Sequence, residues 1–292
     1  MRVQAFAKIN LSLRVLGTRG DGYHELRTVF QSIALHDTLT IRARRGPFAM
    51  TCDDPACPAD ETNLISRAAA SLWRAAGRRG APRDVAIDLQ KRIPVQAGLG
   101  GGSSDAAAAL RALARRWRVG EAKVRAVAAD LGADVPYFLE GGAVLGLERG
   151  DLLFRLAEPS PHWVVLVLPA FGVSTKDAFA WFDRDRRRSD GARAFQARVR
   201  GPERAAPQER ELVNDLQAPV AARHPDIARI TSALRRLGAS HAAMSGSGSA
   251  VFGLFSARES AIEAAGRLKS ASRRTLVTRT LNHQRYQALA AT

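Results

Sequence analysis

The sequence predicts an α+β protein of two domains. Its 292 residues are enough for two domains of moderate size, and its 46% hydrophobic and 25% charged residues are typical of a globular chain. Stretches with alternating apolar residues, typical of strands, are interspersed with stretches of helical periodicity. No run approaches the about 18 apolar residues that a membrane span needs, so we expect none.

The chain opens with residues predicted to form the first strands of a sheet. Residues 3–16 alternate apolar and polar positions, and a glycine-rich turn follows at 17–22. A second strand is expected from about residue 23 through Ile33, with 39–41 continuing the sheet. Residues 44–62 read as a loop that contains one short strand near 48–51.

Helices and strands then alternate up to a proline-rich boundary at 159–161. The expected helices cover 63–78, the residues up to about 117, 121–131 with Gly132 at its end, and a short turn at 133–138. The expected strands cover 85–89, 143–147 and 152–156.

The second domain is expected to alternate strands and helices again. Strands are predicted at 163–168, 241–244, 250–255 and 275–281, and helices at 174–182, 212–222, 226–237 and 257–270. Ser174 or Thr175 is expected to cap the first of these helices. The arginine-rich stretch 184–210 has few large apolar residues, which predicts a mobile loop of unknown role.

Charge and cysteine content narrow the function classes. The net charge of +16 suits anionic partners, but it is spread over many segments, which favours an arginine-rich solvated surface over a nucleic-acid site. Cys52 and Cys57 lack zinc-ligand spacing, so we expect two reduced thiols. The first residues show no secretory signal, which predicts a cytoplasmic protein.

The most informative stretch is Pro94–Leu110, a glycine-rich loop that leads directly into an alanine-rich helix. Gly98, Gly100, Gly101 and Gly102 lie within five positions. Glycine allows positive φ and close approach to the backbone, and the first N–H groups of a helix bind anions. We expect the following serines, Ser103 and Ser104, to cap the helix. The stretch therefore predicts a phosphate-binding loop.

Three other interpretations of this stretch fit less well. A flexible linker would not lie between a strand and a strong helix. A P-loop would have Gly-Lys-Ser/Thr after the glycines, which is absent here. A dinucleotide-binding fingerprint would space its glycines, whereas three of these are contiguous.

Lys8 and a second glycine loop accompany this stretch. Lys8 lies in an otherwise apolar strand, where it is either a paired buried lysine or an edge residue that reaches water. The second loop, residues 245–249, follows the predicted strand 241–244. Together the three features predict a two-domain enzyme that acts on a phosphorylated ligand.

These features resemble the GHMP kinases. The residues that carry the resemblance are Ala7-Lys8-Ile9-Asn10-Leu11, Pro94–Ala109 and Gly246-Ser247-Gly248. The segments Asp21–Leu26 and Leu131–Phe138 resemble one family within them, the 4-diphosphocytidyl-2-C-methyl-D-erythritol kinases. The resemblance covers about residues 5 to 255, with the motifs in the right order.

The resemblance implies a fold and a reaction. The fold has an N-terminal domain like domain 2 of ribosomal protein S5, expected at 1–157 with the ATP site, and a ferredoxin-like C-terminal domain, expected at 158–292. The reaction is ATP- and Mg²⁺-dependent phosphorylation of the 2-hydroxyl of a methylerythritol that carries a cytidine diphosphate group, in the non-mevalonate isoprenoid route. No membrane or nucleic-acid partner is expected, and the oligomeric state is left open between monomer and weak dimer.

The resemblance also assigns roles to residues. Lys8 and Asp134 match the catalytic pair, with Asp134 acting either as a base or as an orienting group. The ATP-binding positions are Pro94, Gly98, Leu99, Gly100, Gly101, Gly102, Ser103, Ser104, Asn63 and Lys91. Ser104 is also the expected magnesium-linked hydroxyl. The residues alone allow plainer roles: Asn63 as a helix cap, Lys91 as a surface lysine and Asp134 as a helix cap.

The substrate-binding positions follow in the same way. Tyr23 and His24 match the cytosine contacts, Phe179 is the expected second face of a ring sandwich, and Asn10 is expected to contact substrate. The diphosphate is expected under Gly246, Ser247 and Gly248. Ser249 and Ala250 depart from the proline and threonine common after this motif, which affects loop stiffness but not charge.

Two alternative functions stay open at this point. The chain could be another GHMP kinase, such as homoserine or mevalonate kinase. The substrates of those enzymes have no base that could stack on Tyr23 and Phe179. An RNA-binding module would suit the charge but would not need Lys8, Asp134 and the glycine loop.

Overall fold

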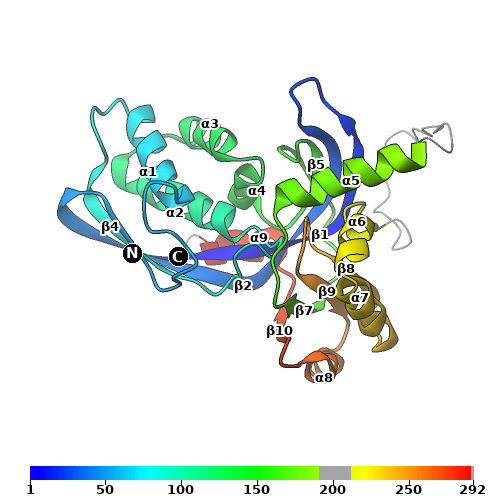
Figure 1. Ribbon diagram of the computed structural model, residues 1–292. Coiled ribbons are helices and arrows are strands. Elements are labelled where there is room, and N and C mark those ends of the chain that lie inside the picture. Colours follow the sequence, from blue (N-terminus) through cyan, green and yellow to red (C-terminus); the bar gives the residue numbers. More distant parts are fainter. Residues whose placement is uncertain (191–211, 291–292) are drawn as a thin grey trace.

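A computed structural model of the chain describes residues 1–190 and 212–290. Figure 1 shows two sheets, each with helices packed against it. Within the described ranges, no helix is both long and apolar enough to cross a membrane.

The first sheet is mostly antiparallel and has the order β3-β4-β2-β5-β6, with β1 paired to β2. Its centre is the β1–β2 hairpin, in which Lys8 is opposite Ser32 and Asn10 is opposite Phe30. The strands are β1 (Arg2–Thr18), β2 (His24–Pro47), β3 (Ala49–Cys52), β4 (Arg83–Gln90), β5 (Ala143–Glu148) and β6 (Leu152–Arg155).

Helices α1 to α3 cover one face of this sheet (Figure 1). The helices of this half are α1 (Leu64–Ala75), α2 (Gly101–Trp117), α3 (Glu121–Leu131) and α4 (Val135–Glu140). Alanines 106, 107 and 109 of α2 are fully buried, which explains the alanine run: small side chains let α2 approach the sheet and α1 closely. This packing fixes the start of α2, where the glycine loop ends.

The second sheet has the order β10-β7-β9-β8 and is antiparallel throughout. Its strands are β7 (Trp163–Pro169), β8 (His241–Met244), β9 (Val251–Phe255) and β10 (Arg273–Arg279). Its helices are α5 (Thr175–Asp190), α6 (Gln217–Arg223), α7 (Asp226–Arg236) and α8 (Arg258–Leu268).

A shared apolar cluster joins the two halves. Ala7 and Ile9 of β1 and Leu99 of the glycine loop pack in one cluster with Leu166 of β7 and Phe252 of β9, and all five are buried. The glycine loop therefore lies directly between the two sheets. The domain division at 157/158 stays a prediction.

The expected strands and helices of the described part are confirmed in type and order, but some bounds differ: β2 runs without a break from His24 to Pro47, into the expected loop 44–62, and α6 begins at Gln217 and not near residue 212. There are three further differences. Gly100, in left-handed backbone at φ 72°, is the N-cap of α2 and makes no side-chain cap bond, so the expected caps Ser103 and Ser104 lie inside the first turn. Helix α5 continues to Asp190, so the start of the arginine-rich stretch is helical; residues 191–210 of it lie outside the described part. A further helix, α9 (His283–Ala290), was not expected.

Candidate active site

The two glycine loops lie against each other between the two sheets. A Cβ atom added to Gly98 would lie 2.1 Å from the carbonyl oxygen of Ser245, so only glycine fits there. Ser245 Oγ donates a hydrogen bond to Gly98 O at 2.9 Å, and Ala250 N donates to Ala97 O at 3.1 Å. The two glycine loops, which lie about 150 residues apart in the sequence, thus form one wall of the candidate active site.

The first glycine loop has the geometry of an anion site. Gly98 and Gly100 have φ near +70°, the left-handed region that favours glycine. Helix α2 begins at Gly101, so the N–H groups of its first residues and its positive end lie in this loop. Leu99 is buried and its carbonyl accepts from Lys8 N at 3.0 Å, which fixes the loop on β1.

Lys8 and Asp134 meet beside this loop. Lys8 Nζ lies 3.8 Å from Asp134 Oδ2; the lysine side chain is 5% exposed and the aspartate side chain 37%. The ammonium also donates to Asn10 Oδ1 at 2.6 Å and to Gly98 O at 3.1 Å. Burial lowers the pKa of Lys8, against the opposing effect of Asp134. Of the two interpretations of Lys8, a paired buried lysine or an edge residue that reaches water, the structure shows the first. Its partner, the carboxylate of Asp134, is partly exposed to solvent.

Asn10 belongs to the support of Lys8. Its Oδ1 accepts from Lys8, its Nδ2 donates to Thr28 Oγ1 at 2.7 Å, and its backbone N donates to Ser245 Oγ at 3.2 Å. Both side-chain groups are thus engaged within the protein, so Asn10 aims the ammonium, and its contact with substrate stays a prediction.

The second glycine loop lies beside the ammonium group of Lys8. A Cβ on Gly246 would lie 3.3 Å from Lys8 Nζ, and Gly248 N donates to Ser245 O at 2.9 Å. Ser247 Oγ is 3.2 Å from Thr175 Oγ1 at the start of α5. This loop and the first one border one space around Lys8.

Asn214 is a residue that the sequence reasoning missed. Its buried Nδ2 donates to Met244 O and to Gly246 O, both at 2.8 Å, and so holds the second glycine loop in shape. The signal was a single asparagine between Val213 and Leu216. A single asparagine is too weak a signal to use without knowing that this segment pairs with β1 at Leu13.

The expected cytosine contacts lie at one corner of the site, where two of them stack on each other, and their roles in base binding stay predictions. His24 lies on Phe179 with ring centroids 4.5 Å apart and planes at 20°, while Tyr23 is 57% exposed near Arg149. Asp183, one turn beyond Phe179 on α5, bonds to His24 Nε2 at 2.9 Å. The stack that the structure shows is therefore His24 on Phe179, and Asp183 is a further residue of this corner that the sequence did not point to.

Two of the expected adenosine contacts are engaged elsewhere. Asn63 caps α1, since its Oδ1 accepts from Ile65 N at 2.8 Å, as the plainer interpretation held. The side chain of Lys91 is buried and not exposed, and its Nζ donates to Asp37 at 2.5 Å and to Asp105 at 2.8 Å. Pro94 is half-buried just before the loop. The ATP roles of these residues stay predictions.

The structure does not favour Ser104 as a metal-linked hydroxyl. Ser104 is 1% exposed and its Oγ donates to Phe6 O at 2.7 Å, so the hydroxyl serves to fix α2 on β1. Ser103, one residue earlier, is less buried. In the described part of the chain, no group of three or more His, Cys, Asp or Glu residues could hold a metal ion.

Comparison with known proteins decides the family. The family described as "GHMP kinases N terminal domain" matches residues 63–142, and "GHMP kinases C terminal" matches residues 192–273. The 4-diphosphocytidyl-2-C-methyl-D-erythritol kinase of Pelotomaculum thermopropionicum is 43% identical over 283 residues, covering 95% of this chain and 97% of that one. The enzyme of the same name from Moorella thermoacetica is 42% identical over 289 residues, covering 96% and 99%.

The chain belongs to the 4-diphosphocytidyl-2-C-methyl-D-erythritol kinase family. A crystal structure of 4-(cytidine 5'-diphospho)-2C-methyl-D-erythritol kinase, 35% identical, superposes with a TM-score of 0.76 and covers 96% of this chain and 99% of that one. A homoserine kinase from Cytophaga hutchinsonii, at 17% identity and a TM-score of 0.67, shares the fold alone. The predicted GHMP kinase fold and the assignment as a kinase are confirmed, and ATP use follows from family membership.

Proposed function

We propose that this chain transfers the γ-phosphoryl group of ATP to the 2-hydroxyl of 4-diphosphocytidyl-2-C-methyl-D-erythritol, a step of the methylerythritol phosphate route to isoprenoids. The observation that carries the proposal is the pair of Lys8 and Asp134, 3.8 Å apart, between two glycine loops. The names of relatives at 42–43% identity over nearly their full length support the choice of substrate.

The triphosphate would lie on the first glycine loop. The N–H groups at the start of α2 and the positive end of this 17-residue helix complement its charge. Mg²⁺ commonly binds through phosphates, waters and only one or two protein groups, so a site with few protein donors is compatible with it. Ser103 is the hydroxyl of the first turn best exposed to serve; the ion would neutralise charge on the phosphates.

The acceptor hydroxyl would lie at the carboxylate of Asp134, whose side chain is 37% exposed. A tertiary alcohol is crowded and weakly acidic, so it needs a group that orients it and takes its proton. Lys8, held by Asn10 and Gly98, faces the same point and stabilises the alkoxide as it forms. Its pKa, lowered by burial, lets this ammonium share its proton more readily than an exposed lysine would.

The cytidine end would bind beside the stack of His24 on Phe179. Asp183 holds the His24 ring by its Nε2, which leaves Nδ1 free of this bond to read the edge of a base. The exposed ring of Tyr23 provides a further stacking face. We propose a cytoplasmic enzyme, monomeric or weakly dimeric, with no nucleic-acid partner.

The test is ADP release from ATP and Mg²⁺ with three alcohols supplied in turn: the cytidine-linked methylerythritol, mevalonate and homoserine. We expect turnover only with the first. Asp134→Ala should abolish it, whereas Asp130→Ala, at an exposed aspartate of α3, should not change it. Asp134→Asn separates the two roles of the carboxylate: an orienting group would keep much of the rate, and a base would lose it.

Other outcomes point to the alternatives. Turnover with mevalonate or homoserine would retain the superfamily and contradict the cytidine site. Steep salt-dependent RNA binding without turnover of any alcohol would favour the binding module.

A further inference from the structure

Helix α4, which begins directly after Asp134, is too short to hold its own position. It has six residues, includes Pro136, and lies between Gly132 and Gly141. Isolated helices shorter than about 12 residues are marginal in water. The position of Asp134 therefore depends on what α4 contacts.

The end of α4 is held by the unexpected C-terminal helix α9. The last four carbonyls of any helix have no partner within it. Here Tyr137 O accepts from Gly141 N at 2.8 Å, the bond that closes the helix. The next carbonyl, Phe138 O, accepts from the hydroxyl of Tyr286 on α9 at 2.6 Å.

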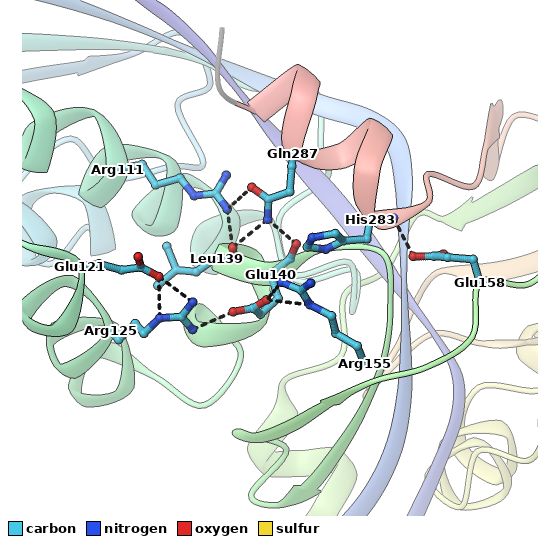
Figure 2. Close-up of polar contacts among 9 residues, drawn as sticks. All are labelled: Arg111, Glu121, Arg125, Leu139, Glu140, Arg155, Glu158, His283 and Gln287. Atoms are coloured by element: carbon cyan, nitrogen blue, oxygen red, sulfur yellow. Dashed lines mark hydrogen bonds and ion pairs between the residues drawn. The ribbon is translucent and has the colours of Figure 1, made fainter. Parts of the chain in front are cut away.

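The remaining two carbonyls also receive side-chain donors (Figure 2). Gln287 of α9 donates through Nε2 to Leu139 O at 3.1 Å and to Glu140 O at 2.6 Å. Arg111 of α2 donates to the same Leu139 O and to Gln287 Oε1. All four terminal carbonyls are thus satisfied, and three of them accept hydrogen bonds from α9.

Two glycines after α4 make this docking possible. A Cβ on Gly141 would lie 2.1 Å from the ring of Tyr286, and one on Gly142 would lie 2.7 Å from His283 N. Tyr286 is 2% exposed, and burial raises its pKa to about 12, which keeps its hydroxyl a donor. Close packing of this kind indicates one defined position of α9 on α4.

Helix α4 also contacts the surroundings of the catalytic pair, through the side chain of Phe138. The ring of Phe138, whose carbonyl Tyr286 binds, packs on Gly100 so closely that a Cβ there would lie 2.6 Å from it. The same Cβ would lie 3.2 Å from Lys8 Cε. Helix α4 therefore has Asp134 at its start, and its Phe138 packs beside the first glycine loop and Lys8.

We propose that α9 is a positioning element for phosphoryl transfer, in which Tyr286 and Gln287 set the place of Asp134 through α4. This inference rests on the proposed role of Asp134. A displacement of a reacting group by about 1 Å can lower a rate by about 100-fold, so loss of one of several bonds should have a smaller but measurable effect.

The test compares Tyr286→Phe and Gln287→Leu with Gln284→Leu, which makes the same chemical change at an exposed position of the same helix. We expect the two former variants to lower kcat about tenfold with KM for both substrates unchanged within about twofold. The control should keep the full rate. Hydrogen exchange of the α4 amides should be faster in the same two variants and not in the control.

A second comparison shows whether the effect passes through Asp134. If it does, Tyr286→Phe should cause little further loss of rate in the Asp134→Ala background, in which both roles of the carboxylate are gone. An undiminished tenfold loss in that background, or faster α4 exchange with an unchanged kcat, would overturn the inference. If Asp134→Ala leaves no measurable rate, kcat of the single variants and the exchange rates of the α4 amides decide between the outcomes. Full activity of Asp134→Ala alone would instead refute the catalytic assignment under the proposed function, and with it this positioning role.

Discussion

Removing the ammonium of Lys91 should strongly destabilise the protein. Lys91 Nζ lies between the carboxylates of Asp37 and Asp105, whose side chains are 0% and 3% exposed. Asp37 also accepts from two backbone N–H groups, whereas Asp105 Oδ1 has no hydrogen-bond partner in the described part of the chain. Lys91→Met would leave two buried carboxylates without their cation, a change that typically costs about 3–5 kcal/mol.

The loss should depend on pH in a defined direction. Burial raises the pKa of Asp105 to about 8, from its ordinary value of 3.8. A carboxyl group with a raised folded-state pKa binds its proton more tightly in the folded protein, so stability falls as pH rises through this window. Without Lys91 this effect should grow, and the destabilisation by Lys91→Met should be larger at pH 8 than at pH 5.5.

Urea unfolding followed by circular dichroism at both pH values measures these effects, with Lys123→Met at an exposed lysine as the control. The double variant Lys91→Met/Asp105→Asn should recover part of the loss, because one buried charge is then gone. A loss below about 1 kcal/mol, equal to that of the control, would refute the view that Lys91 is a structural cation.

Three further predictions concern the loops and the second sheet. Gly98→Ala should remove most ATP binding, measured by calorimetry, because its Cβ would lie 2.1 Å from Ser245 O and its φ is +74°; unchanged affinity would contradict the loop assignment. Asn214→Leu should raise KM for the alcohol substrate in steady-state kinetics, since two carbonyls of the second glycine loop lose their donor, and an unchanged KM would oppose this. Burial lowers the pKa of His241 to about 4 from 6.5, so the stability that the neutral ring contributes is lost as pH falls through this range. In His241→Gln, the free energy of unfolding measured in urea should therefore fall less steeply between pH 6.5 and pH 4 than in the unaltered protein. An equally steep fall would refute this prediction.

Much of the fold was predictable because its signals are local. The alternation in β1 and the apolar spacing of α1 each lie within one element, and both elements form where these patterns predict them, although residues 5–10 of β1 are buried on both faces. The start of α2 was placed wrongly in detail. Serine is a common cap, but Gly100 takes the cap position because the backbone there must adopt a left-handed turn against Phe138.

The contacts that define the candidate site were less predictable because their partners are distant in sequence. Lys91 bonds to Asp37, 54 positions away, so the residues next to Lys91 in the sequence do not indicate that its side chain is buried. The stack of His24 on Phe179 joins β2 to α5, two elements that lie far apart in the sequence. Helix α9 did leave a signal, an asparagine cap at Asn282 followed by apolar spacing, but its length of eight residues gives that pattern little weight.

The apolar cluster shared by the two halves limits how the enzyme can open. Ala7 and Leu99 of the first half are buried together with Leu166 and Phe252 of the second, so hinging of one sheet away from the other would expose this cluster to water. At about 25 cal/mol per Å² of apolar surface, even a few hundred Å² would oppose such a motion by several kcal/mol. Substrate exchange should therefore depend on α5 and the second glycine loop, which meet at the exposed contact of Thr175 Oγ1 with Ser247 Oγ. Hydrogen exchange should then slow on substrate binding in α5 and this loop, while the strands of the shared cluster stay protected throughout.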